Sequence, residues 1–424
     1  MMPISRMVRP LLFLMLTFFI IPAKINLFSI EITTPYIAIF PFLFLYLFNI
    51  IYAPPSKREF FILFSFLIAL CYSLIIILLY GAVEWFVLKL VLIGFALFVS
   101  SMQIVRLYFK IYGADAEKIL VNDLIFIGVM NAFIAILMLL SPKVSDFFYN
   151  FISTNENNIT HLQQGYRSSG LFYAGASILS VFNAMVFLLC VFRFANNSSR
   201  NNMKNYMLGI ICSATLLLGT FISGRLGIIL IIGVIVAVFF IPNSPVSFRK
   251  MLFIIFSVLC ISMATILIVV PWEQITGIAG WALEIFINMY KSGKIESGST
   301  GLLFDTMYFL PKNPIDMFFG MGTFGRGDNV EYINSDVGYV LMIFFGGFIA
   351  IPILFLPYVA CFIFAKTLKD KNIKYIVCFV LFFILIGNFK DVYLYGINGV
   401  TQVLFILVAV FIIKGKYANI DSDS

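Results

Sequence analysis

Charged residues are scarce in this chain. They make up 11% of its 424 residues, whereas 62% are hydrophobic, and a soluble domain has roughly 25% charged residues. This scarcity excludes a soluble protein built around a buried core. The long apolar runs also lack the alternation of apolar and polar residues that a membrane β-barrel requires. Because only helices and closed barrels satisfy their backbone hydrogen bonds in lipid, the sequence predicts an all-α polytopic membrane protein.

Residues that ligate metals or form disulfides are also few. His161 is the only histidine, which excludes a histidine-based zinc motif and a Ser/His/Asp triad. Two interpretations of His161 stay open, a lone general base and a solvated loop residue. The six cysteines all fall in apolar segments, and their spacings match neither a disulfide framework nor a metal site. We therefore expect no metal and no cofactor.

What the chain does contain is a series of apolar segments of about 20 residues, the length that a membrane-spanning helix needs. Twelve such segments lie at 8–22, 33–53, 60–80, 86–105, 119–140, 171–192, 206–222, 226–241, 251–270, 337–358, 375–388 and 397–413. Every second loop between them is basic, which by the positive-inside rule predicts that both termini are cytoplasmic. The net charge of +8 then reflects orientation in a membrane, and we expect no nucleic-acid partner.

Two loops on the side opposite the termini are long, at about 141–170 and 271–336. Long loops usually carry function, because short ones suffice to join helices. Apolar residues recur at helical spacing in the second loop, which predicts an amphipathic helix that lies on the outer surface or packs on the bundle. These residues are Trp272, Ile275, Ala279, Ala282, Phe286 and Met289. We interpret residues 1–424 as a single transmembrane domain.

Arg225 is the one charge in an apolar run of 35 residues from Met207 to Ile241. A single helix of that length would measure about 52 Å, much more than a hydrocarbon core of ~30 Å. The run must therefore fold back, and Ser223 and Gly224 mark where, since an arginine at mid-membrane costs about 2.5–3.5 kcal/mol. Arg225 is predicted at the outer apex of a hairpin and at a helix N-terminus, where the helix dipole and free N–H groups favour an anion.

Three more charges are predicted at the same outer end. Arg167 in YRSSGLF and Lys390 in GNFKDVYLYG each precede a helix that descends into the membrane, and Asp336 precedes another. For the cations, two interpretations are open: they bind an anionic ligand, or they snorkel to headgroups and pair with acids. Asp336 could act chemically or could cap its helix.

Other sequence signals argue against nucleotide binding and ion-coupled transport. The stretch GMGTFG at 320–325 fits G-x-G-x-x-G, but it lies in an outer loop rather than between a strand and a helix. It is either a plain turn or, with Arg326 beside it, a place where backbone approaches a sugar or phosphate. No carboxylate falls at a predicted membrane midplane, which weakens an ion-coupled transporter and favours chemistry at the outer surface.

Four pieces of the sequence resemble bacterial O-antigen polymerases of the Wzy type. They are YRSSGLFYAGAS (166–177), GTFISGRLGIIL (219–230), FLPKNPIDMFFGMGTFGRG with SDVGYVLMIFFGGFIA (309–350), and GNFKD (387–391). The resemblance implies a GT-C-like glycosyltransferase of the bacterial inner membrane. The implied reaction joins undecaprenyl-diphosphate-linked oligosaccharides at the periplasmic face and releases undecaprenyl diphosphate, with no metal and no nucleotide sugar. Membrane lipid is an implied partner, and a chain-length regulator protein could be another.

This reaction builds negative charge on a leaving diphosphate, which preorganised cations stabilise. The resemblance assigns that task to Arg167 and Arg225, because a guanidinium matches phosphate oxygens bidentately. Lys390 or Arg326 would assist them, and Tyr339 is a further predicted substrate-binding residue. These assignments require the side chains to share one site.

The attacking sugar hydroxyl needs a base. We predict Asp336 for this role, with Asp305 and Glu331 as alternatives. Two other functions stay open. An O-antigen ligase would transfer the finished chain to lipid A core, but such enzymes typically carry a histidine in the large periplasmic loop, and 271–336 has none. A flippase or other transporter of lipid-linked oligosaccharides would favour charged or broken helices at mid-depth, which are not evident.

Overall fold

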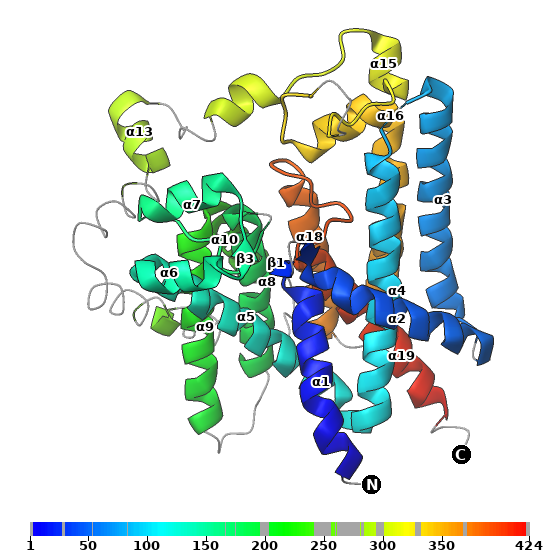
Figure 1. Ribbon diagram of the computed structural model, residues 1–424, viewed down its shortest axis with the longest axis vertical. Helices are drawn as coiled ribbons and strands as arrows, with labels where there is room; N and C mark the ends of the chain where they lie inside the picture. The colour runs from blue at the N-terminus through cyan, green and yellow to red at the C-terminus, as the bar shows by residue number, and fades with distance from the viewer. Residues whose placement is uncertain are drawn as a thin grey trace.

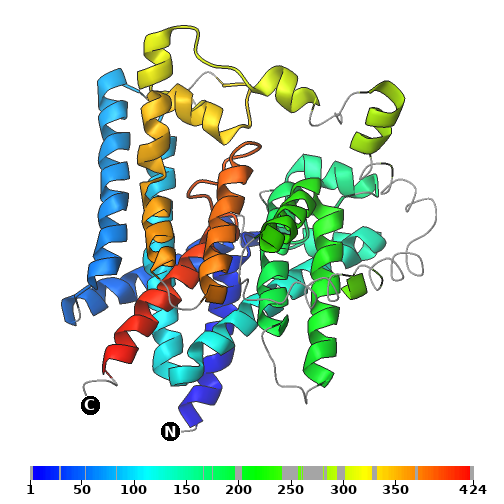
Figure 2. The same ribbon diagram turned by 180° about the vertical axis from the view of Figure 1, so that it is seen from behind.

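A computed structural model describes residues 3–27, 30–52, 54–82, 84–165, 167–173, 175–195, 203–240, 256–258, 260, 280, 284–293, 301–326, 332–367 and 371–420. Over these ranges the chain is a bundle of helices with one small sheet (Figures 1 and 2). The helices of the bundle are α1 (Pro3–Ile20), α2 (Thr34–Tyr52), α3 (Lys57–Tyr80), α4 (Phe86–Tyr112), α5 (Ala116–Leu140), α8 (Ala176–Ala195), α9 (Met203–Ser223), α10 (Arg225–Phe240), α16 (Gly338–Leu354), α17 (Leu356–Lys366), α18 (Lys371–Gly387) and α19 (Val400–Ile420).

Helices therefore stand at eleven of the twelve predicted spans. The ninth, at 251–270, lies almost wholly outside the described residues. Four described stretches are long and apolar enough to cross a membrane. They are Lys57–Tyr80, Phe86–Leu140, Ala176–Phe194 and Gly338–Lys366, and the short helix η1 (Gly113–Asp115) divides the second of them into α4 and α5. The remaining apolar helices are shorter, and the number of crossings stays a prediction.

Local signals explain how individual helices begin and end. Ser56 and Glu59 form a capping box at the start of α3, in which each side chain accepts a hydrogen bond from the other residue's N–H. Gly81 closes the helix with a φ of 57°, a value that glycine adopts without steric cost. Burial sets the place of α19 instead. Nearly all of its residues from Val400 to Ile413 are buried, and it packs against α4 and α18 at the centre of the bundle.

The span predicted at 337–358 coincides with one of the four long apolar stretches, but this stretch is kinked and interrupted. Gly346 and Gly347 inside α16 have non-helical backbone angles, and Phe355 separates α16 from α17. Gly347 has a φ of 70°, and a Cβ there would overlap the Phe318 carbonyl oxygen. Only glycine combines this backbone angle with such a close approach.

The segment that follows α15 (Pro314–Phe319) packs against the kink in α16. The carbonyl oxygens of Phe344 and Phe345 accept hydrogen bonds from the N–H groups of Met321 at 2.7 Å and Gly322 at 3.0 Å. Carbonyl groups released from the helix ladder are thus satisfied by a neighbouring loop. The contact anchors the GMGTFG stretch to the bundle.

A three-stranded sheet corrects the all-α prediction. Its order is β2 (Ile30–Thr33), β1 (Lys24–Leu27), β3 (Ile152–Ser153), and both pairings are antiparallel. These strands have two to four residues, too few for an alternating pattern to stand out. The partner strand β3 lies more than 100 residues away in the chain, and only the folded bundle brings it to β1.

Both long loops contain secondary structure. The first holds α6 (Pro142–Tyr149), β3 and α7 (Glu156–Gln163), and the second holds α13 (Glu284–Ser292), the π-helix η2 (Leu303–Met307) and α15. The predicted amphipathic helix at 272–289 overlaps α13 and otherwise lies outside the described residues. Figure 1 shows α7, α13 and α15 at one end of the molecule, here named the loop end. At the opposite end, named the terminal end, α1 begins and α19 finishes.

Candidate functional site

The apolar run around Arg225 divides into two helices, as predicted. α9 ends at Ser223 and α10 begins at Arg225, with Gly224 between them. Both helices pack against α8. At Gly227, two residues after Arg225, a Cβ would overlap the Ser180 carbonyl oxygen of α8. This close approach holds the start of α10, and with it Arg225, against the bundle at the loop end.

Arg167 lies at the same break between helices. Its Nε donates a hydrogen bond to the Ser223 carbonyl oxygen at 2.8 Å, and the N–H of Ser168 donates to Ile222 at 3.2 Å. Arg167 therefore meets the C-terminal end of α9, whose free carbonyl groups attract a cation. The expectation that it directly precedes a helix is wrong, because α8 begins only at Ala176. Its hydrogen bond to Ser223 instead places Arg167 at the break between α9 and α10, where Arg225 begins α10.

Lys390 joins these two arginines. It lies beyond the end of α18, in the segment 388–399 that leads to α19. Burial, together with the positive charges of Arg167 and Arg225, lowers the pKa of Lys390 to about 8, although neighbouring Asp391 acts to raise it. Arg167, Arg225 and Lys390 are here named the cationic cluster. Three segments far apart in the chain supply its members.

Asp391 is a functional candidate that the sequence reasoning missed. Burial, together with the negative charge of Asp336, raises its pKa to about 6. The N–H of Val392, which donates to its Oδ1 at 2.7 Å, and the charges of Lys390 and Arg326 act in the opposite direction. A carboxylate with a pKa near neutral beside a cationic cluster is typical of a functional site. Its one sequence signal was adjacency to Lys390 in GNFKD.

Asp336 has a different environment from the one expected of a base. Its side chain is 56% exposed, and its Oδ1 accepts a hydrogen bond from Nη2 of Arg326 at 3.1 Å. The same Arg326 nitrogen donates to the Ser335 carbonyl oxygen at 2.6 Å. Asp336 does not cap α16, because the N-cap residue is Val337 and carries no side-chain cap. Its charge acts mainly on Arg326 and Asp391.

The carboxylate of Glu84 accepts hydrogen bonds from backbone N–H groups in and just after the GMGTFG stretch. Its Oε2 accepts from the N–H groups of Phe324 at 2.6 Å and Gly325 at 2.9 Å, and its Oε1 accepts from the N–H of Arg326 at 2.7 Å. The side chain is only 3% exposed. A protein carboxylate thus already fills the anion-binding backbone that this glycine-rich stretch offers. The interpretation as a structural turn is favoured over a phosphate-binding loop.

We expect replacement of Glu84 by Ala to destabilise the protein by about 2–4 kcal/mol, because buried N–H groups left without acceptors cost about 1–3 kcal/mol each. Thermal unfolding of the detergent-solubilised chain measures the effect. Asp146→Ala, which removes an exposed carboxylate of α6, is the control and should change stability by less than about 0.5 kcal/mol. Equal melting temperatures for the two variants would contradict the assigned role of Glu84.

Arg225 also contacts the second long loop. Its Nη2 lies 2.6 Å from Oε2 of Glu284 in α13, and the arginine side chain is 12% exposed. Any anion bound at Arg225 must therefore share it with Glu284 or displace that carboxylate. The pair links the cationic cluster to the loop that the sequence identified as functional.

The remaining predicted site residues lie near the cluster or outside the described chain. The Tyr339 hydroxyl donates to the Leu385 carbonyl oxygen at 2.9 Å and so ties α16 to α18. Asp305 is exposed on η2, and Glu331 lies outside the described residues. His161, on α7, lies beside Arg167: burial lowers its pKa, and the charge of Arg167 lowers it further.

No protein-family model, curated protein or solved structure matches the chain. The chemistry of the loop end must therefore be inferred from the residues of this chain. In the described part of the chain, no group of three or more acidic, histidine or cysteine side chains is arranged to hold a metal. What the geometry does offer is a set of cations, suited to bind phosphate oxygens, beside a carboxylate suited to accept a proton.

Proposed function

We propose that this chain is an integral-membrane glycosyltransferase that polymerises undecaprenyl-diphosphate-linked O-antigen repeat units. In this proposal the fold is GT-C-like, the loop end faces the periplasm, and both termini lie on the cytoplasmic side of the bacterial inner membrane. The observation that carries the proposal is the convergence of Arg167, Arg225 and Lys390 beside Asp391, whose pKa is about 6. The four apolar helices long enough to span a membrane agree with it.

The cationic cluster suits the donor side of this reaction. As the bond between the anomeric carbon and the diphosphate oxygen breaks, its electron pair passes to the diphosphate. Two guanidinium groups and an ammonium group, already assembled before the reaction, stabilise that charge without reorganising. Arginine provides paired donors for the phosphate oxygens, and lysine provides a point charge. When the diphosphate binds, it either displaces Glu284 from the ion pair with Arg225 or binds to Arg225 together with Glu284.

Asp391 suits the acceptor side better than Asp336. The acceptor hydroxyl forms the new bond to the anomeric carbon and loses its proton to a carboxylate. A base works best when its pKa lies near the working pH, and the pKa of Asp391 is about 6. Asp336 is exposed and paired with Arg326. Its role in the proposal is to raise the pKa of Asp391 and to hold Arg326.

Complementation of a bacterial strain that lacks its O-antigen polymerase tests the proposal. The wild-type chain, expressed with the matching repeat-unit enzymes, should restore the ladder of lipopolysaccharide lengths on a gel. A strain without a polymerase carries lipopolysaccharide with a single repeat unit. If the expressed chain leaves that pattern unchanged, the assignment as a polymerase is wrong.

One observation favours O-antigen ligase as a second candidate. The only histidine of the chain, His161, lies beside Arg167, although it belongs to the first long loop and not the second. As a base beside a cation that binds diphosphate, it would suit ligation as well. A strain that loses a ligase carries bare lipid A core, so complementation distinguishes the two functions.

For a polymerase that uses Asp391, we expect His161→Gln to retain the ladder with less than about a threefold change in polymerisation rate. A general base contributes about 10²–10⁴-fold, so a much larger loss would identify His161 as the base. Gel analysis of lipopolysaccharide from both polymerase-null and ligase-null strains makes the measurement. His161→Ala, at matched expression, serves as the second variant.

A further inference from the structure

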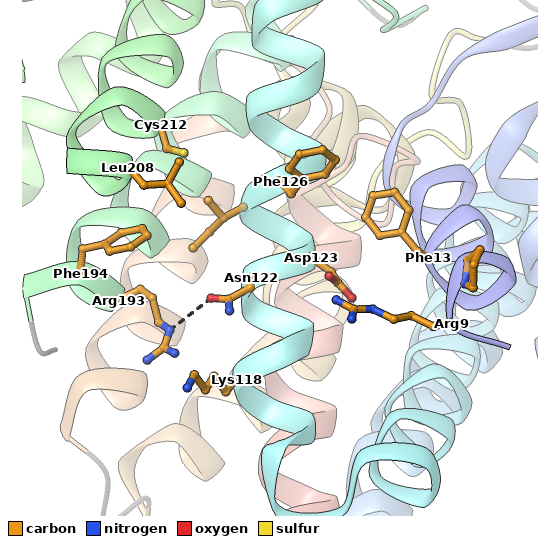
Figure 3. A pocket seen from close by; sticks show the side chains of 12 residues that line it. Arg9, Phe13, Lys118, Asn122, Asp123, Phe126, Arg193, Phe194, Leu208 and Cys212 are labelled. Carbon is orange, nitrogen blue, oxygen red and sulfur yellow. Dashed lines mark hydrogen bonds between the residues drawn. The ribbon is translucent and has the colours of Figure 1, made fainter. Parts of the chain in front are cut away.

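A cavity of about 690 Å³ lies at the terminal end, away from the cationic cluster (Figure 3). Its walls come from α1, α5, α8 and α9. The lining residues used below are Arg9, Lys118, Asp123, Phe126, Arg193 and Leu208. This volume falls in the range of about 300–1,000 Å³ that is usual for small-molecule sites.

One side of the cavity is rich in positive charge. The lining includes Arg9 of α1, Lys118 of α5 and Arg193 of α8 but only one carboxylate, Asp123, so it has a net charge of +2 (three cations less one anion). Figure 3 shows Arg9 directed toward Asp123, while the ends of Lys118 and Arg193 gather on the other side of α5. Asp123 is further held by the Tyr108 hydroxyl at 2.9 Å.

Lys118 and Arg193 are the cations available to a ligand. Arg193 donates from Nε to Oδ1 of Asn122 at 3.3 Å, which orients the guanidinium group and leaves its terminal nitrogens toward the cavity rim. No ion pair neutralises Lys118 within the ranges that the structure describes. Two cations that converge from separate helices form a site for an anionic group such as a phosphate.

The other side of the cavity is apolar. Phe126 is 58% exposed and Leu208 is 54% exposed, and Phe13 and Phe194 complete this wall. Figure 3 shows Phe126 and Leu208 above the charged side chains in this view, with Phe194 near Arg193 and Phe13 near Asp123. A ligand that fits must be anionic at one end and hydrocarbon at the other.

We propose that this cavity binds an anionic phospholipid, with the headgroup phosphate at Lys118 and Arg193 and an acyl chain along Phe126 and Leu208. Basic pockets between helices at the cytoplasmic side of membrane proteins are suited to such headgroups. The bound lipid bridges α5 with α8 and α9. The proposal is independent of the chemistry assigned to the loop end.

Titration of the purified full chain with lipids, followed by native mass spectrometry, tests this proposal. Phosphatidylglycerol should bind at least tenfold more tightly than phosphatidylcholine. Lys118→Gln combined with Arg193→Gln should weaken phosphatidylglycerol binding about 30-fold, since each basic residue near an anionic headgroup contributes roughly a fivefold factor. Lys57→Gln combined with Lys110→Gln removes two exposed lysines outside the cavity and should leave the affinity unchanged.

Three outcomes would overturn the proposal. The first is equal affinity for the two lipids, and the second is an equal loss in both double variants. The third concerns the source of the anion: inorganic phosphate, added alone at millimolar concentration, should not displace phosphatidylglycerol. If inorganic phosphate displaces phosphatidylglycerol, the cavity is a site for free anions and not for a lipid. The melting temperature of each lipid-free variant shows whether its fold is intact.

Discussion

Replacement of Asp391 by Asn should lower the rate of repeat-unit polymerisation by about 10²–10⁴-fold, the usual contribution of a general base. The variant keeps the size of the side chain and an oxygen for the N–H of Val392, which donates to Oδ1 in the wild type. It removes only the ability to accept a proton. Initial rates of ladder formation in membrane vesicles supplied with lipid-linked repeat units provide the measurement, and immunoblotting corrects for protein level.

The pH dependence of the wild-type rate should be bell-shaped. Asp391 must be ionised to act as a base, so activity rises as pH rises through its pKa of about 6. Lys390 must be protonated to hold the diphosphate, so activity falls as pH rises through its pKa of about 8. The maximum therefore lies between these two values. Lys390→Gln should abolish the alkaline limb and retain the acidic one.

Asp336→Asn is the matched control for Asp391→Asn. The charge of Asp336 raises the pKa of Asp391, so its removal should move the acidic limb to lower pH and leave most of the activity at pH 7. If Asp336→Asn is as inactive as Asp391→Asn, the base is Asp336, as the sequence alone suggested. A wild-type profile without an acidic limb near pH 6 would contradict the assignment of Asp391 as the base.

The second large effect concerns the two arginines. Arg167→Ala and Arg225→Ala should each reduce the polymerisation rate by about 10²–10³-fold, the usual loss when one preorganised donor to a developing negative charge is removed. The double variant should lose less than the product of the two single losses, because both groups act on one diphosphate. Arg→Lys at either position should recover part of the rate, since lysine keeps the charge but not the paired donors.

Glu284→Gln separates the catalytic role of Arg225 from a structural one. Arg225 pairs with Glu284 at 2.6 Å. If Arg225 served only to hold α13 in place, loss of the ion pair would be as damaging as loss of Arg225. If Arg225 binds the diphosphate, Glu284→Gln should keep the rate and lower the apparent KM for the lipid-linked donor. Lys143→Ala, on the exposed surface of α6, tests whether any cation at the loop end matters.

The sequence indicated candidate charges at the loop end but not the contacts that they make. It identified Arg167, Arg225 and Lys390 from charge in apolar surroundings, and the structure brings all three together. It proposed Asp336 as the base, from its place before a helix, and did not consider Asp391. The pKa of Asp391 depends on burial and on Asp336, Lys390 and Arg326, and of these only the neighbouring Lys390 can be read from local sequence. Glu84 was missed because its backbone partners lie about 240 residues away.

The amino-acid sequence by itself determined the helical character of the chain, the place of most helices and the break at Gly224. These features follow from local properties. A helix satisfies its own backbone hydrogen bonds, so the length of an apolar run predicts a helix, and the single arginine within one run predicts the break. Only the tertiary structure decided the kink at Gly346 and Gly347, the small sheet and the different environments of Asp336 and Asp391. Each of these depends on contacts between distant segments, where close packing and burial set backbone angle and charge alike.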